Sequence, residues 1–264
     1  MFSDSHAHLD FDSFDPDRGD VIQRAKDIGL QFIINIAIDL PGARNSIGLA
    51  KDYPGFLFAT AGIHPNYSAD LTESQTIELA ELAAQPEVVA IGEIGLDYYR
   101  DYATPQQQLT ALEIQLSLAQ KLDLPIVIHE RDSAHELAPI LVNWWQNLPE
   151  STRIKHNPGV MHAYSADLSY VNTLLECGFC FGIGGPVTYK NAVEKQALVA
   201  SLPLEKMLLE TDCPFMPPQK HRGQRNEPSF IPLIAQKIAD LRGLSHEEAG
   251  KQLTNNARRL FRII

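Results

Sequence analysis

The sequence predicts a (β/α)8 barrel that covers residues 1–264 as a single domain. Eight short apolar runs alternate with amphipathic segments, at about 33 residues per unit. Most of these runs end in a histidine or an acidic residue, and a barrel gathers such strand ends at one rim. The alternative is an open, doubly wound sheet. That fold favours a glycine-rich turn after the first strand, where this chain has His6, Ala7 and His8.

The predicted strands are continuous apolar runs rather than alternating ones. Continuous runs are typical of parallel strands that are buried on both faces of a sheet. We expect these strands at residues 2–6, 32–38, 56–63, 88–94, 125–129, 160–164, 179–183 and 207–210.

The segments between the runs carry apolar residues at helical spacing. Two of them begin with a capping box, formed by Thr72 with Gln75 and by Ser245 with Glu248. Leucine recurs at helical spacing in the longest of them. The expected helices are 16–28, 72–84, 105–122, 134–146, 168–177, 191–200, 230–241 and 245–260.

Composition and charge restrict the classes of function. Neither a signal-peptide pattern nor an apolar run of about 18 residues is present, so we expect a cytoplasmic protein without a membrane segment. We also expect it to be a monomer. We interpret Cys177, Cys180 and Cys213 as core residues rather than as a redox pair, a disulfide or metal ligands. The net charge of −11 disfavours long-range attraction of a polyanion. Bound cations and clustered arginines can still make the electrostatic potential positive at the opening of one site.

Two histidines one residue apart, His6 and His8, indicate where a functional site lies. In a strand both project to the same face, where they can bind one metal ion together. Such a pair alone is more typical of a protein surface. Polar residues of ligand type also end five further runs, and each alone is explained by a core hydrogen bond or a helix cap. Together they predict one metal site, because buried charges need partners. Its predicted ligands are His6, His8, Glu93, His129, His162 and Asp212.

Six ligands are too many for one ion that must keep an open coordination position, so we expect two divalent cations. The chain order suggests that the two N-terminal histidines and Asp212 hold one ion. His129 and His162 then hold the other, and Glu93 bridges the two. Imidazole ligands favour zinc or manganese, and magnesium accepts such a site weakly, which leaves Zn²⁺, Mg²⁺ and Mn²⁺ as alternatives.

The same residues resemble the TatD-type metal-dependent hydrolases of the amidohydrolase-like barrels, and within them the YjjV branch. The resemblance covers nearly the whole chain, including the tail 255–261, and rests on His6-x-His8, Gly92-Glu93-Ile94-Gly95-Leu96-Asp97-Tyr98, His129, His162 and Glu210-Thr211-Asp212-Cys213-Pro214. It implies a barrel, two divalent metals at the six positions above, and hydrolysis of phosphodiesters in DNA, often from a 3′ end. One departure is His162-Ala163-Tyr164, where the family often has His-Cys-Phe, and this departure leaves the substrate range open.

We predict a hydrolase that uses a metal-activated water. Asp212 and Glu93 are the expected catalytic residues, Asp212 as general base and Glu93 as bridging ligand. The expected substrate contacts or supports of the ligands are His64, Asp97, Arg131 and Arg222.

Some of these supporting roles have a structural alternative. His64 precedes a proline and fits a turn, and the basic loop 220–225 fits a solvated surface. Tyr98 and Tyr164 fit base stacking and packing equally well.

The predicted substrates are DNA ends, short single strands or small phosphodiesters. An alternative on the same site is hydrolysis of a small ester, lactone or amide. A deaminase would normally need one metal and a separate glutamate, and a non-catalytic barrel would tend to lose a ligand, so the complete set of six argues against both.

Overall fold

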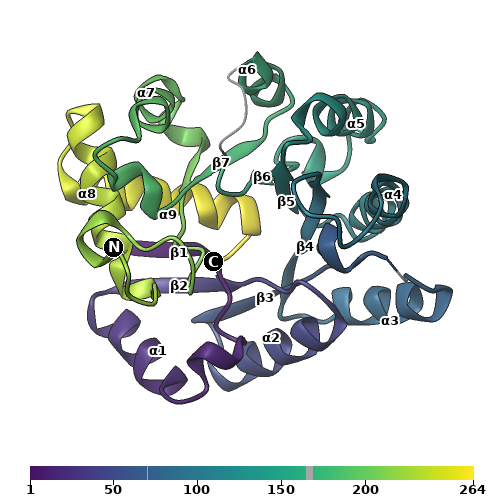
Figure 1. Ribbon diagram of the computed structural model, residues 1–264, viewed down its shortest axis with the longest axis horizontal. Coiled ribbons are helices and arrows are strands. Elements are labelled where there is room, and N and C mark those ends of the chain that lie inside the picture. Colours follow the sequence, from purple (N-terminus) through teal and green to yellow (C-terminus); the bar gives the residue numbers. More distant parts are fainter. Residues whose placement is uncertain (70, 165–168) are drawn as a thin grey trace.

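The computed structural model describes residues 1–69, 71–164 and 169–264. Within these residues one parallel sheet runs in the order β1 to β8, with helices arranged around it (Figure 1). The strands are β1 (Phe2–Ala7), β2 (Leu30–Asn35), β3 (Leu57–Ala61), β4 (Val88–Asp97), β5 (Ile126–Arg131), β6 (Gly159–Met161), β7 (Cys180–Ile183) and β8 (Met207–Leu209). The predicted (β/α)8 barrel and its eight strand positions are therefore confirmed.

Backbone contacts just past the end of β8 bring the last strand to the first. Ala7 pairs in parallel with Cys213, and the His8 N–H donates to the carbonyl of Cys213 at 2.9 Å. The Asp212 N–H donates to the carbonyl of His6 at 2.8 Å. The barrel thus closes at the segment that carries three of the predicted metal ligands.

The described helices agree with the predicted ones in position, apart from one addition. They are α1 (Arg18–Asp27), α2 (Leu40–Asp52), α3 (Glu73–Ala83), α4 (Pro105–Leu122), α5 (Ala134–Gln146), α6 (Ser169–Glu176), α7 (Val193–Ser201), α8 (Ile231–Arg242) and α9 (His246–Phe261). Both predicted capping boxes are present, at the starts of α3 and α9. The predicted start of the sixth helix, residue 168, lies outside the described residues.

The added helix is α2, which the sequence analysis did not predict. Its glycines, Gly42 and Gly48, weaken the helical pattern. Local signals were present nonetheless: Asp39 accepts a hydrogen bond from the Gly42 N–H at 2.7 Å, and Pro41 occupies the first turn. Ile47 is among the residues that α2 buries in the core. Capping and burial together outweigh the low intrinsic propensity.

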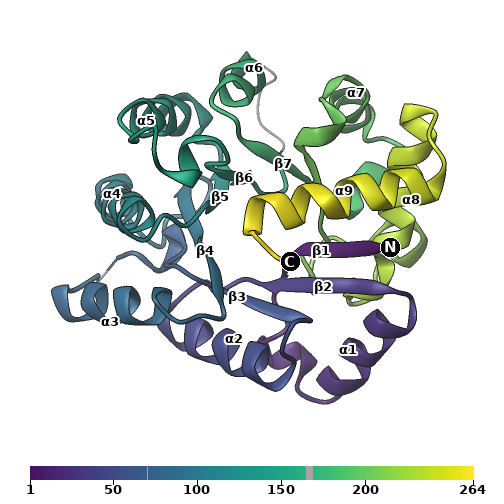
Figure 2. The same ribbon diagram turned by 180° about the vertical axis from the view of Figure 1, so that it is seen from behind.

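The interior of the barrel is a separate apolar cluster that α9 covers at one end. Alternate residues of β2 belong to it, together with single residues of β4 to β8 and the last turns of α9. The Asn256 side chain donates to the carbonyls of Leu204 and Met207, at the start of β8. Helix α9 therefore lies across the N-terminal ends of the strands (Figure 2). The cluster comprises Phe32, Ile34, Ile36, Ala90, Val127, Val160, Cys180, Leu208, Ala257, Leu260 and Phe261.

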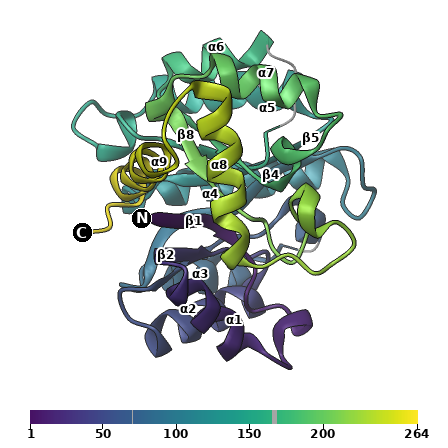
Figure 3. The ribbon, with the colours of Figure 1, turned by 90° about the vertical axis from the view of Figure 1, so that its left-hand side faces the viewer.

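The three cysteines are buried and free, as predicted. In the described part of the chain, no helix combines the length and apolar character needed to cross a membrane. In the side view, α9 lies at one end of the barrel and the segment between β8 and α8 extends at the other (Figure 3). That second end carries the polar residues described next.

Candidate metal centre

The six predicted ligands converge at the C-terminal ends of five strands. They are imidazole and carboxylate groups from segments that lie far apart in the chain. All of these residues except His129 are at least nine-tenths buried. They lie on β1 (His6), just after β1 (His8), on β4 (Glu93), on β5 (His129), just after β6 (His162) and after β8 (Asp212).

Four of these residues form a compact group of donor atoms. The Nε2 atoms of His6 and His8 are 3.2 Å apart. Glu93 Oε2 lies 3.4 Å from His6 Nε2, and Asp212 Oδ1 lies 3.3 Å from His8 Nε2. Ligands at 2.0–2.2 Å around one tetrahedral ion are about 3.3–3.6 Å from each other. The spacing and the chemistry of this donor set therefore fit a divalent cation.

The other oxygen of Glu93 faces a second set of rings. Its Oε1 lies 2.9 Å from His129 Nδ1 and 3.9 Å from His162 Nε2. His162 also lies 3.8 Å from Asp212 Oδ1 and stacks on the His6 ring, with ring centroids 3.5 Å apart. Glu93 thus stands between two groups of nitrogen atoms, with one carboxylate oxygen directed at each.

Neighbouring acceptors orient two of the imidazole rings. His8 Nδ1 lies 2.9 Å from the carbonyl of Ile36, which can only accept, so Nδ1 carries the proton and leaves Nε2 available to a metal. His129 Nε2 lies 3.0 Å from Asp97 Oδ2, which leaves Nδ1 directed at Glu93. Asp97 therefore lies where a residue that orients a ligand histidine is needed.

Charges within the cluster compensate each other. Burial lowers the pKa of His129, but the hydrogen bonds that its ring donates to Asp97 and Glu93 outweigh burial and raise this pKa to about 9. Burial likewise opposes protonation of His162, whose pKa nearby Glu210 and Asp212 raise to about 10. Burial raises the pKa of Glu93, yet the surrounding histidines hold it well below its usual range. Without a cation, protons on His129 and His162 balance part of the charge of these carboxylates.

Two buried carboxylates that the sequence analysis did not assign support the ligands. Asp4 accepts hydrogen bonds from the Thr211 N–H at 2.9 Å and from its hydroxyl at 2.5 Å, and thereby fixes the residue before Asp212. Glu210 Oε1 lies 3.3 Å from His162 Nδ1. Period-two alternation places Asp4 on the same face as His6, so this signal was present in the sequence.

Gly95 allows β4 and β5 to approach closely between Glu93 and Asp97. Its φ is +145°, and an added Cβ would lie 1.9 Å from the carbonyl oxygen of His129. A larger residue would therefore push His129 away from both carboxylates. This requirement explains the glycine between Glu93 and Asp97.

His64 lies beside the cluster and differs from the ligands in its ring contacts. Its Nδ1 accepts the Asn66 N–H at 3.1 Å, so the neutral ring carries its proton on Nε2. That Nε2 lies 3.8 Å from Glu93 Oε1. Burial lowers the pKa of His64 to about 3, which keeps the ring neutral. In this arrangement Nε2 is a hydrogen-bond donor directed at the site.

A cavity of about 390 Å³ opens above the cluster and carries two arginines on its wall. Arg131 was predicted as a substrate contact, whereas Arg100, in the loop after β4, was not. The guanidinium of Arg131 lies 3.6 Å from the Tyr99 ring centre, and that of Arg100 lies 5.2 Å from it. The Tyr99 ring thus holds two guanidinium groups beside the cavity.

The chain matches the family model "TatD related DNase" over residues 3–262. It is 36% identical to the uncharacterized metal-dependent hydrolase YabD of Bacillus subtilis, with both chains fully covered. This chain belongs to the TatD family. The 3'-5' ssDNA/RNA exonuclease TatD of Erwinia billingiae is 35% identical, with 98% of each chain covered. The crystal structure of the TatD homologue YjjV from Escherichia coli superimposes with a TM-score of 0.90 at 32% identity, covering 100% of this chain and 98% of that one.

The TatD assignment confirms the predicted family, the barrel and the class of metal-dependent hydrolase that acts on ester bonds. Candidate groups of metal-binding residues agree with the class, and three such groups lie in the described residues.

Arg222, the remaining predicted substrate contact, has a different neighbour. Its guanidinium lies over the Tyr189 ring, 4.8 Å from the ring centre, and it is not among the described residues that line the cavity. Arg225 of the same loop pairs with Asp17 at 2.7 Å. Part of the basic loop 220–225 therefore makes structural contacts in this TatD protein.

The two tyrosines with open roles are both packed. The Tyr98 hydroxyl donates to Glu136 Oε2 at 2.7 Å, and its ring packs against the core. Tyr164 is 3% exposed, and its ring meets Phe181 edge to face, with ring centroids 5.2 Å apart. Neither tyrosine is among the described residues that line the cavity above the cluster, which favours the packing alternative.

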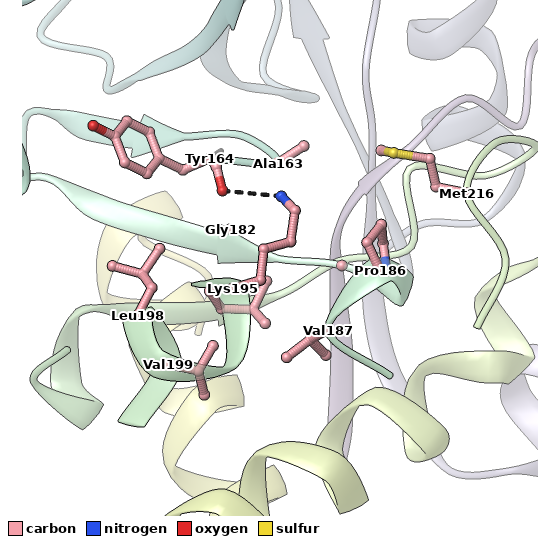
Figure 4. Close-up of a pocket in the computed structure, with 11 residues that line it drawn as sticks. Ala163, Tyr164, Gly182, Pro186, Val187, Lys195, Leu198, Val199 and Met216 are labelled. Carbon is pink, nitrogen blue, oxygen red and sulfur yellow. Dashed lines mark hydrogen bonds between the residues drawn. The ribbon is translucent and has the colours of Figure 1, made fainter. Parts of the chain in front are cut away.

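The departure from the TatD pattern at Ala163 and Tyr164 borders a small second cavity. Figure 4 shows Lys195 reaching across it, and its amino group donates to the Tyr164 carbonyl at 3.2 Å. The cavity holds about 20 Å³, which is room for about one water molecule. The Ala163 N–H donates to Glu210 Oε1 at 2.7 Å. The altered residues therefore lie beside a support of His162.

Proposed function

We propose that this TatD protein uses two divalent cations to remove nucleotides from the 3′ end of single-stranded DNA or RNA. The observation that carries the proposal is the position of Glu93, whose two carboxylate oxygens face separate groups of ring nitrogens. A bridging carboxylate between two ions needs this arrangement. Relatives named as 3'-5' ssDNA/RNA exonucleases, which match over nearly their whole length, support the substrate class.

We assign the first ion to the two N-terminal histidines, Asp212 and Glu93 Oε2. The second ion is assigned to Glu93 Oε1, His129 and His162. The distances of 2.9–3.9 Å among these donor atoms support both assignments. Nitrogen-rich ligands favour zinc or manganese over calcium, and magnesium remains an alternative.

Bound cations would lower the pKa of a water molecule toward neutrality and neutralise charge that develops on the phosphate. In this proposal Asp212 accepts the proton of the attacking water through its carboxylate. The Asp212 N–H donates to the His6 carbonyl, and Thr211 is held by Asp4, so the base has a fixed position. Its φ of +55° is tolerated because aspartate enters the left-handed region more readily than most residues.

The charge and hydrogen-bond donors around the cavity match a phosphodiester. Arg100 and Arg131 present guanidinium groups, which suit phosphate oxygens because they can donate two parallel hydrogen bonds. Neutral His64 adds an Nε2–H donor close to Glu93. A lactone or an amide has no anion for the two arginines to bind, so these donors favour the phosphodiester over that alternative.

The test is a panel of substrates and metals with protein first stripped by chelator. We expect stepwise shortening of 5′-labelled single strands after Mg²⁺, Mn²⁺, Zn²⁺ or Co²⁺ is restored, and up to two ions per chain by elemental analysis. Asp212→Asn should remove most turnover. Turnover of lactones alone would overturn the proposal, and so would shortening from the 5′ end only.

We also propose that the protein is a cytoplasmic monomer. Three buried, free cysteines agree with a reducing compartment. Light scattering on the metal-loaded protein tests the monomer, which predicts a mass near 29.4 kDa. Fractionation of the cells that make the protein tests the compartment.

A further inference from the structure

We propose that a groove beside the metal centre binds the base of the 3′-terminal nucleotide and excludes a further phosphate. This inference rests on the proposed nuclease function and adds the part of the substrate that the site recognises. It would make the protein act on ends, because the strand can enter the groove only with its last nucleoside.

The groove has a volume of about 490 Å³ and adjoins the cavity above the cluster. Phe11, Ile38, Tyr67 and Phe215 line both spaces. A nucleotide bound to the metals by its 5′-phosphate can therefore place its base in the groove. The volume also exceeds what one base requires, so the sugar has room.

Aromatic rings line the side of the groove nearest the metals. Phe215 is 51% exposed and Tyr67 is 55% exposed, so both offer ring surface to a ligand. Phe11 stacks on the ligand His8 with ring centroids 4.7 Å apart, and Phe215 meets Phe11 edge to face at 6.1 Å. These contacts fix the aromatic wall relative to the proposed metal site. Stacking on such rings is tolerant of base identity, because every base has a π face.

The part of the groove lining that the cavity does not share is acidic. Asp10, Asp12 and Asp39 line it, and no Lys or Arg does so among the described lining residues. The start of α2 is also there, but its Gly42 N–H is already bonded to Asp39 at 2.7 Å. A phosphate in the groove would meet carboxylates and a capped helix end. Exocyclic amino groups of bases are donors and suit the same carboxylates.

The opposite charges on the cavity wall and in the groove thus give the strand a direction. Arg100 and Arg131 attract the phosphates of the remaining strand, whereas the aspartates of the groove repel them. The scissile phosphate lies between these regions. Only the terminal nucleoside, which carries no phosphate on its 3′ side, then fits the acidic groove.

The first experiment compares single strands that differ only at the last position. One ends in a normal nucleotide, one ends in an abasic tetrahydrofuran residue, and a third carries the abasic residue at the penultimate position. We expect the terminal abasic residue to lower kcat/KM for release of the last nucleotide about tenfold, the size of one stacking interaction. We expect the penultimate abasic residue to have less than about one third of that effect. Equal rates for normal and abasic ends would overturn the proposal.

Variants test whether the groove causes the ratio of kcat/KM for the normal end to kcat/KM for the terminal abasic end. Phe215→Ala should bring the ratio of normal to abasic rates close to one, and Phe215→Tyr should keep it. Because Phe215 also lies near the His8 ring, with ring centroids 6.3 Å apart, absolute rates can fall, but the ratio corrects for this loss. The matched control is Tyr102→Ala: Tyr102 is 64% exposed and lines neither space, so the ratio should not change. An unchanged ratio in Phe215→Ala would overturn the assignment of the base to this groove.

A second experiment tests the acidic side with strands that end in a 3′-phosphate. The wild-type protein should cleave them at least about tenfold more slowly than 3′-hydroxyl strands, and Asp12→Asn should narrow the difference. A 3′-phosphate strand cleaved as fast as its hydroxyl counterpart would contradict the exclusion. If no strand is shortened with any metal, the proposed nuclease function fails. If shortening occurs and neither the base nor the 3′-phosphate matters, only the groove proposal fails.

Discussion

The two ends of this barrel are formed by the same strands and bury opposite kinds of side chain. At the N-terminal end, α9 inserts Leu260 and Phe261 against the apolar barrel interior. At the C-terminal end, charged and imidazole groups are buried with partners that only partly satisfy them, since His6 Nδ1 has no hydrogen-bond partner among the described residues. The first end stabilises the fold, and the second holds charge in place for a cation. Each prediction below separates these two contributions.

The largest expected effect is at the C-terminal end, in Glu93→Gln. An amide can no longer bridge two cations, so we expect kcat/KM to fall at least about 10³-fold and metal content to drop. Phosphodiester turnover and elemental analysis measure both. The matched control is Glu113→Gln at an exposed position of α4, which should keep full activity. Two bound ions and normal turnover in Glu93→Gln would contradict the bridging role.

At the opposite end, Leu260→Ala should change stability and leave chemistry intact. Leu260 is 1% exposed, so its truncation leaves a cavity that costs about 2–5 kcal/mol of unfolding free energy. Urea unfolding in chelator measures the loss, and kcat/KM at a temperature where the variant is folded should match the wild type. Ile77→Ala, at an exposed position of α3, is the control with little effect on either. A large fall in kcat/KM of folded Leu260→Ala would show that the two ends are coupled.

The two ends should also differ in their response to pH. His129 has a pKa raised from 6.5 to about 9, so the stability that its protonation gives the metal-free protein is present below pH 6.5 and is lost as pH rises through 9. Metal affinity should change the other way, rising about tenfold per pH unit for each proton displaced. Unfolding in chelator between pH 6 and 9, and calorimetric titration with Zn²⁺ or Mn²⁺, measure the two slopes. Leu260→Ala should leave both slopes unchanged, and a flat metal affinity would contradict the proton balance.

A smaller effect is expected when a support of the cluster is removed. Asp97→Asn keeps the size of the side chain but removes the charge beside His129 Nε2. We expect a 10- to 100-fold loss in metal affinity or turnover, as is usual when an orienting residue is lost. The metal-free variant should also show a lower pKa for His129 by NMR titration, because Asp97 helps to raise it. An unchanged pKa would mean that Asp97 acts only in packing.

The difference between the ends also explains what the sequence could predict. Glu93, His129 and His162 end apolar runs, and in a parallel barrel all strand ends of one sense meet at one rim, so their convergence followed from pattern and topology. Arg100 and Phe215 lie in loops that carry no period, and their positions depend on contacts far apart in the chain. Helix α2 was not predicted because its two glycines weaken the helical pattern in the sequence. The helix forms because its N-cap and its buried face stabilise it. Candidate site residues at the ends of strands can therefore be predicted from the sequence, whereas Arg100 and Phe215 in the loops could not.

The smallest and most selective effects are expected from Arg131 and Arg222, which were both predicted as substrate contacts. Arg131→Met should raise KM for strands about tenfold and change kcat little, because it removes a guanidinium held by Tyr99 on the cavity wall. Arg222→Met should change KM less than about twofold, since its partner is Tyr189 and it lies outside that wall. Salt titration of KM sharpens the contrast: the Arg131 variant should lose part of the wild-type salt dependence, and the Arg222 variant should keep it. Equal increases in KM and equal losses of salt dependence in the two variants would mean that the strand also contacts the 220–225 loop. Arg100 and Arg131 would then be only part of the surface that binds the strand.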